Sequence, residues 1–151
     1  MRVVDVMAEI GAAVELGHRG EPDAARRRLA QLWEDPAVRG DPFHRCTLAH
    51  YAADLEQETA DELRWDLLAL AAADEVTDER ARAHHSSLSI AGFYPSLHLN
   101  LGDDYQRLGD PAGARHHLEL ARAASADLPD EGYGRMIRAG IERLAQRCGG
   151  A

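Results

Sequence analysis

The fold is decided by the stretch LHLNLGDDYQRLGDPAGARHHLELA, residues 97–121. Leu101 and Tyr105 lie four residues apart, on one face of a predicted helix that Pro95 begins and Gly109 ends. Asp110-Pro111 then begins a second helix, because aspartate can cap free N–H groups and proline suits the first helical turn. The stretch therefore predicts two helices joined by a tight turn.

The same signals for helix starts and helix ends recur along the chain. An apolar stripe from Val3 to Leu16 stops near Gly17 and Gly20, as expected for a first helix. Thr59 and Glu62 have the spacing of a capping box, in which each side chain satisfies a free N–H at a helix start. Further helix starts are predicted at Glu21-Pro22, Asp41-Pro42, Thr77-Asp78 and Pro129-Asp130, and the last helix ends at Gly149-Gly150. No alternating strand pattern competes, so we predict an all-α fold of seven or eight helices.

Two pairs of segments match one another, which indicates an internal repeat. Gly20–Leu29 aligns with Gly109–Leu118: in both, a glycine ends one helix, an acid–proline pair begins the next, and an alanine precedes a leucine by four residues. Phe43–Leu55 aligns with Phe93–Tyr105, where Ala52 matches Gly102, Asp54 matches Asp104 and His50 takes the place of Asn100. Helical hairpins that repeat cannot each bury an apolar face alone, so they are expected to stack on one another.

The order of residues in the deciding stretch resembles the tetratricopeptide repeat (TPR) family. The residues that carry the resemblance are Leu101, Gly102, Tyr105, Gly109, Ala114, Leu118 and Ala121. It implies a right-handed solenoid of antiparallel helical hairpins with degenerate repeats, since Ala12, Ala13 and Leu16 stand at the matching places of the first copy. The copies are also spaced wider than the family's ~34 residues. We expect residues 1–148 to form one domain and 149–151 a disordered tail, with a helical bundle lacking true repeats as the alternative.

In that family the first helix of each hairpin lines a concave groove that binds a partner. The resemblance places the following residues in the groove: His50, Ala53, Asp54, Asn100, Asp103, Gln106 and Arg107. It implies a non-catalytic interaction module for a peptide or helix of another protein. The aspartates, Asp104 included, favour a basic or amide-rich guest. Because the chain has no lysine, a clamp for a peptide's terminal carboxylate is not expected.

Composition restricts the partners further. The chain of 151 residues carries 17 basic and 26 acidic side chains, a formal net charge of −9. Such a surface repels nucleic acid and anionic membranes, so neither is an expected partner. Cys46 and Cys148 lack the spacing of a disulfide framework or zinc knuckle, and no apolar run has the length of a membrane span. A cytoplasmic location fits these features, no cofactor is implied, and a homodimer stays open.

Two other classes of function also stay open. A small metal-binding enzyme or sensor in a helical bundle would use His50, His98 and nearby acids, although a metal site needs about three or four ligands. A sensor or dimerisation domain that acts beside a DNA-binding partner is the other class. The sequence has no nucleophile elbow, phosphate-binding loop or dinucleotide fingerprint, so catalysis is not expected. Residues 76–92 are compatible with either a helix or a lid.

Overall fold

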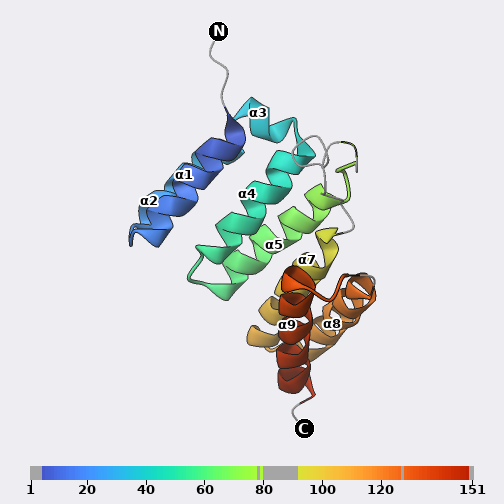
Figure 1. Ribbon diagram of the computed structural model, residues 1–151. Helices are drawn as coiled ribbons and strands as arrows, with labels where there is room; N and C mark the ends of the chain where they lie inside the picture. Colours follow the sequence, from blue (N-terminus) through green and yellow to red (C-terminus); the bar gives the residue numbers. More distant parts are fainter. Residues whose placement is uncertain (1–4, 78, 80–91, 127, 150–151) are drawn as a thin grey trace. The chain divides into compact units, whose positions relative to one another are not determined.

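The computed structural model describes residues 5–77, 79, 92–126 and 128–149, and their regular structure is entirely helical. The chain divides into two compact units, Met1–Glu75 and Val76–Ala151. The first contains α1 (Val6–His18), α2 (Pro22–Trp33), α3 (Pro36–Arg39), α4 (Pro42–Asp54) and α5 (Thr59–Ala73) (Figure 1). The second contains α7 (Tyr94–Arg107), α8 (Pro111–Ser125) and α9 (Gly132–Cys148).

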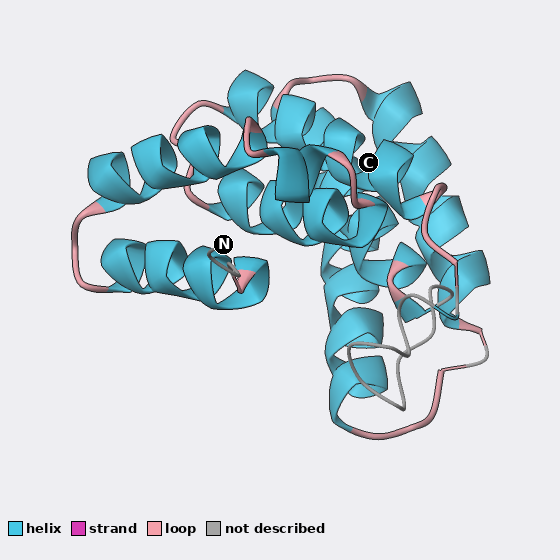
Figure 2. Ribbon diagram, turned by 90° about the horizontal axis from the view of Figure 1, so that it is seen from above, coloured by secondary structure: helices cyan, strands magenta, loops and turns pink. Residues whose placement is uncertain are grey.

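These eight helices, counted over the described residues, confirm the all-α prediction. Figure 2 shows helices, turns and loops and no strand in the described part of the chain. The question of a helix or a lid at residues 76–92 falls mostly on positions outside the described residues.

Three helix pairs are packed as hairpins: α1 with α2, α4 with α5, and α7 with α8. The turns at Gly20 and Gly109 are built alike, with φ angles of 86° and 79°. Only glycine adopts this left-handed backbone without a steric cost, and a proline follows two residues later in the first turn of the next helix. The first repeat predicted from the sequence is therefore confirmed at the level of backbone conformation.

The side chains that follow these two turns are also equivalent. Ala25 and Ala114 are both 0% exposed, and Leu29 and Leu118 are 0% and 4% exposed. Each alanine brings its helix close to the preceding one, and each leucine fills the core one turn later. The alignment of the second helices of these two hairpins thus reflects the same packing role.

Aspartate–proline pairs begin helices as expected. The Asp41 side chain accepts hydrogen bonds from the backbone N–H groups of Phe43 and His44, and Asp110 accepts from Gly113. Asp35 caps the short helix α3 in the same manner, a start that the sequence analysis did not predict although it carries the same signal.

Two predicted helix starts are wrong in detail. Helix α5 begins at Thr59, so Glu58 and not Thr59 occupies the capping position, and the Glu58 side chain makes no cap hydrogen bond. Helix α9 begins at Gly132 instead of at Pro129-Asp130. The chain there turns back on the helix: the Pro129 carbonyl lies where a side chain at Gly134 would be, and Arg138 donates to the carbonyls of Ser125 and Leu128.

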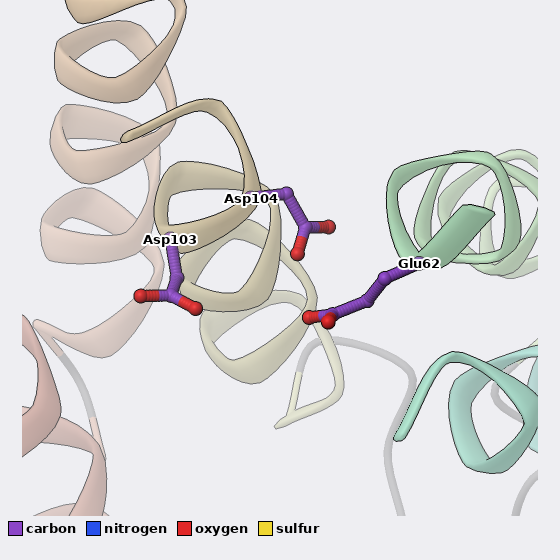
Figure 3. A group of neighbouring side chains, drawn as sticks. All are labelled: Glu62, Asp103 and Asp104. Atoms are coloured by element: carbon purple, nitrogen blue, oxygen red, sulfur yellow. The ribbon is translucent and has the colours of Figure 1, made fainter. Parts of the chain in front are cut away.

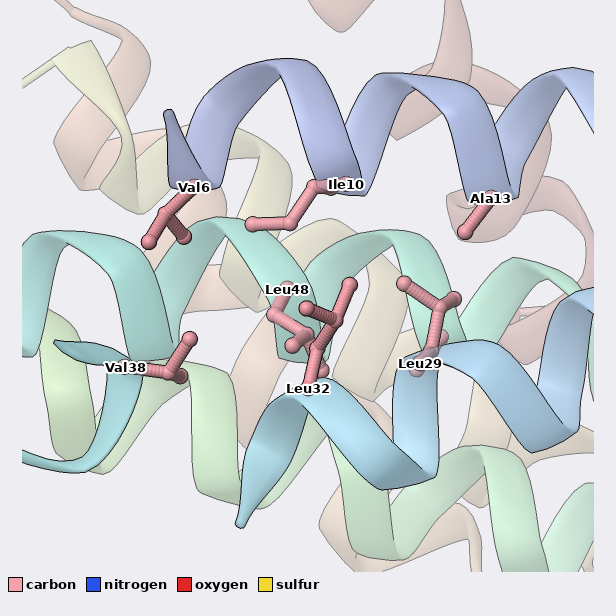
Figure 4. Close-up of a cluster of buried hydrophobic side chains, with 8 residues drawn as sticks. Val6, Ile10, Ala13, Leu29, Leu32, Val38 and Leu48 are labelled. Carbon is pink, nitrogen blue, oxygen red and sulfur yellow. The ribbon is translucent and has the colours of Figure 1, made fainter. Parts of the chain in front are cut away.

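The first unit has its core between α1, α2, α3 and α4. Figure 4 shows the apolar side chains of these helices pointing toward one another. The buried members are Val6, Ile10, Ala13, Leu29, Leu32, Val38, Leu48 and Ala52. Trp33 and Trp65 pack edge to face with ring centroids 5.2 Å apart, and both contact this cluster as partly buried residues.

The second unit is held together by α9, which packs on both α7 and α8. The buried residues Leu118, Ala121, Ile137, Ile141 and Leu144 form its core. Gly102 of α7 permits a close approach, because a side chain at this position would meet Leu144 at 2.7 Å and the backbone of α8 beyond it.

Candidate functional site

The predicted groove residues of the first unit lie at the end of α4. His50 is half-buried and Asp54 is exposed, whereas Ala53 is buried at 1% exposure. The placement of Ala53 in a groove is therefore wrong, because its side chain packs inside the unit. The sequence analysis missed Tyr51, which is 41% exposed and contacts the His50 ring. Its position three residues before Asp54, on the same helix face, was the available signal.

Electrostatic coupling links the polar residues at this end of α4. Partial burial raises the pKa of Asp54, and the negative charge of Glu62 raises it further while His50 acts in the opposite direction. Asp54 and Glu62 therefore form an acidic pair on adjacent helices of one hairpin. Together with Tyr51, they present carboxylates and an aromatic ring on one surface.

The predicted groove residues of the second unit follow one face of α7. Asn100, Asp103 and Gln106 are half-buried and Arg107 is exposed. They recur every three or four residues, the spacing at which helical side chains share a face. Leu101 and Gly102, which alternate with them, are buried in the unit.

Asp103 is bound by two arginines. Arg107 donates to its Oδ2 atom at 2.9 Å, and Arg147 at the end of α9 donates to its Oδ1 atom at 2.6 Å. The neighbouring Asp104 is 0% exposed and accepts a hydrogen bond from Arg107 at 3.0 Å. Figure 3 shows the Asp103 and Asp104 carboxylates leaving α7 in different directions. The Asp104 side chain is thus buried, whereas that of Asp103 is half-buried.

Gln106 also contacts the end of α9. Its amide nitrogen donates to the Arg147 carbonyl at 3.4 Å, and its amide oxygen lies 3.8 Å from the Cys148 sulfur. Half of the predicted face of α7 is therefore in contact with the chain's own last helical turn. Sequence reasoning did not foresee this, because Arg147 lies 44 residues from Asp103 and belongs to no repeat.

His98 meets a second histidine instead of the acids predicted for it. Its Nδ1 atom lies 3.1 Å from Nδ1 of His117 on α8. The ring centroids are 5.3 Å apart and the ring planes are inclined by 23°, and in such a pair one Nδ1 atom donates the hydrogen bond while the other accepts it. Tyr94 and Tyr105 flank the pair on either side.

His117 is neutral near pH 7. His117 is only 9% exposed, and burial lowers its pKa to about 4, with the charges of His98 and His116 acting in the same direction. A neutral imidazole is a metal-ligand group. Among the described residues, however, no third His, Cys, Asp or Glu atom completes a ligand set with His98 and His117.

The remaining residues of the metal hypothesis are placed as follows. His50 lies on α4 of the first unit and His98 on α7 of the second. Cys46, one turn before His50, is buried, and desolvation raises its pKa to about 11. The thiol is therefore protonated at neutral pH and is neither a nucleophile nor a ready metal ligand.

Comparisons with known proteins add no relative. No protein-family model, no curated protein and no solved structure matches the chain. None of the described helices combines the length and the apolar character needed to cross a membrane.

Proposed function

We propose that this protein is a non-catalytic interaction module that binds a peptide or helix of a partner protein along the first helices of its hairpins, α4 and α7. The observation that carries the proposal is the accessibility of the predicted contact residues. None of His50, Asp54, Asn100, Asp103, Gln106 and Arg107 is buried, although they alternate with fully buried neighbours. A helix that buries one face and keeps polar side chains on the other suits a scaffold with a binding face.

The chemistry of these side chains favours a basic partner. Asp54 and Glu62 provide negative charge beside Tyr51 on the first unit, and the chain as a whole carries a net charge of −9. An arginine or lysine could pair with the carboxylates and pack on the exposed tyrosine ring. Charge complementarity of this kind contributes mostly to specificity and to the rate of association.

We further propose that the hairpins belong to a TPR-like array that works in the cytoplasm. Support comes from the repeated Gly20 and Gly109 turns, and from Gly102, where α7 closely approaches the backbone of α8 at Ala114. Close helix contacts of this kind are typical of helical-repeat proteins.

The direct test is affinity capture from a lysate of the native cell, with bound proteins identified by mass spectrometry. Wild type is compared with Asn100→Ala and Asp103→Arg, which should each reduce capture of the same protein at least several-fold. Because Asp103 also pairs with Arg147, the reversal at 103 alone places three positive charges together. The matched control is therefore the charge-swapped double variant Asp103→Arg/Arg147→Asp, which restores an ion pair between α7 and α9.

The double variant separates the two roles of Asp103. If Asp103 contacts the partner, capture stays low when the pair is swapped, even though α9 is held as before. Recovery of full capture by the swapped variant would mean that Asp103 acts only through the fold. Unchanged capture by all variants would remove α7 from the binding surface altogether.

A further inference from the structure

The end of α9 is attached to α7 differently from the rest of the helix. Ile137, Ile141 and Leu144 are 2%, 4% and 0% exposed, so the first three turns of α9 are fixed in the core of the unit. Beyond Leu144, Ala145 and Cys148 still pack against this core as partly buried residues, and the helix adds polar contacts to α7 through Arg147 and Cys148. These polar contacts fall on Asp103 and Gln106, two residues of the proposed binding face.

The contact itself has the form of a bound peptide. The Arg147 guanidinium donates to the Asp103 carboxylate at 2.6 Å, and the Arg147 backbone carbonyl accepts a hydrogen bond from the Gln106 amide at 3.4 Å. One side-chain bond and one backbone bond to a single residue are what a helix or extended segment carrying arginine would make on this surface. Gln106 thus recognises the main chain, and Asp103 recognises the charge.

The contact is also weak enough to exchange. The Arg147 and Asp103 side chains are 47% and 31% exposed, and ion pairs between groups this accessible to water contribute little to stability. Asp103 keeps Arg107 as a second partner at 2.9 Å, so its charge remains compensated when Arg147 leaves. The last turn of a helix frays easily because its carbonyls lack intrahelical partners.

From these contacts we propose that Arg147 occupies, within the chain, the place of an arginine of the partner, and that the partner's arginine displaces the last turn of α9 from Asp103 and Gln106. This inference rests on the proposed function and adds two things to it. The partner segment carries an arginine whose own backbone carbonyl is accessible, and the C-terminal turn of α9 competes with it.

Site-specific NMR tests the proposal with a defined probe. The full chain, labelled with ¹⁵N, is titrated with N-acetyl-arginine amide while the side-chain amide resonance of Gln106 is followed. N-acetyl-citrulline amide, which has the same shape without the charge, serves as the control probe. Arg147→Ala is compared with wild type and with Arg143→Ala, which removes an exposed arginine one turn earlier on the same helix.

We expect the Gln106 resonance to respond to the arginine probe in every chain with an intact Asp103. In Arg147→Ala the half-saturating concentration should be about two- to fivefold lower than in wild type, the change that loss of one exposed competing ion pair produces. Arg143→Ala should behave as wild type, citrulline should give no response, and Asp103→Asn in the Arg147→Ala background should abolish the response.

Equal half-saturation in wild type and Arg147→Ala would overturn the inference and leave the proposed function standing, since the surface would still bind a cation without competition. If the Gln106 resonance of Arg147→Ala does not respond to the arginine probe, Asp103 and Gln106 do not bind an arginine, and the inference is wrong. If the arginine titration is as expected but the lysate capture finds no partner, the proposed function is contradicted and the competition by Arg147 is not.

Discussion

Helices α4 and α7 have aligned sequences, yet they expose different residues. Tyr51 aligns with Leu101; the first is 41% exposed and the second is 0% exposed. Asp54 aligns with Asp104, and again the first is exposed and the second is buried. The comparison teaches that a shared register determines which helices pair, whereas the helices around each pair determine which side chains reach solvent.

The counter-ions explain part of this difference. Asp104 has Arg107 three residues later on the same helix, at 3.0 Å. The residue aligned with Arg107 is Gln57, which carries no charge and follows the end of α4 at Asp54. A buried carboxylate needs a paired donor, so Asp104 can be buried where Asp54 stays at the surface.

The largest expected effect comes from truncating the aligned pair at Tyr51 and Leu101. Leu101→Ala should destabilise the second unit by about 2–5 kcal/mol, because it leaves a cavity in the core. Tyr51→Ala should change the first unit by roughly 0.5 kcal/mol, since the side chain is largely at the surface. Native-state hydrogen exchange of α7 and α4 amides measures both, and similar losses in the two units would contradict the assignment of these surfaces.

The next effect concerns pH and is confined to the second unit. The pKa of His117 is about 4 in the folded protein and near 6.5 when unfolded, so between these values the unfolded chain binds more protons. Stability present above pH 6.5 should therefore decline as the pH falls toward 4, by up to about 3 kcal/mol. Near pH 4.5, exchange protection should decrease in α8 more than in α4.

A matched pair of variants isolates this pH effect. His117→Phe keeps a ring between Tyr105 and His98 and should flatten the pH dependence of α8 protection, whereas His18→Gln changes an exposed histidine of the first unit and should leave it unchanged. Tryptophan fluorescence reports on the first unit alone, because Trp33 and Trp65 both lie there. An unaltered slope in His117→Phe would show that other groups drive the acid response.

A smaller difference is expected between the aligned aspartates. Asp104→Ala should destabilise the second unit by about 1–3 kcal/mol, because it removes the buried ion-pair partner of Arg107. The cost is limited because the exposed Arg107 guanidinium can form hydrogen bonds with water instead. Asp54→Ala should cost less than about 0.5 kcal/mol. Urea denaturation followed by circular dichroism gives the free energies, and a larger cost for Asp54→Ala would reverse the comparison.

Much of the fold could be predicted from the sequence because its signals are local. A glycine before an acid–proline pair specifies a helix end and a helix start within a few residues, and both copies of this signal form equivalent turns. The start of α9 was predicted too early because Arg138 and Gly134 shape that turn from within the helix. Local propensity does not encode such a return of the chain.

The candidate site was less accessible to prediction because its decisive contacts are not local. Asp103 meets Arg147 across 44 residues, and His98 meets His117 across 19. The helical period correctly places Asn100, Asp103 and Gln106 on one face. It cannot tell which other helix contacts that face, nor that Ala53 and Asp104 are buried.

The most direct test of the central claim is photo-crosslinking in the native cell, with benzoyl-phenylalanine placed at Tyr51 or Asn100 and, as a control, at the exposed Glu142 of α9. If the accessible faces of α4 and α7 bind a partner, positions 51 and 100 should give a crosslinked product containing one and the same second protein, and position 142 should not. Products of equal yield from all three positions, or none from 51 and 100, would contradict the account.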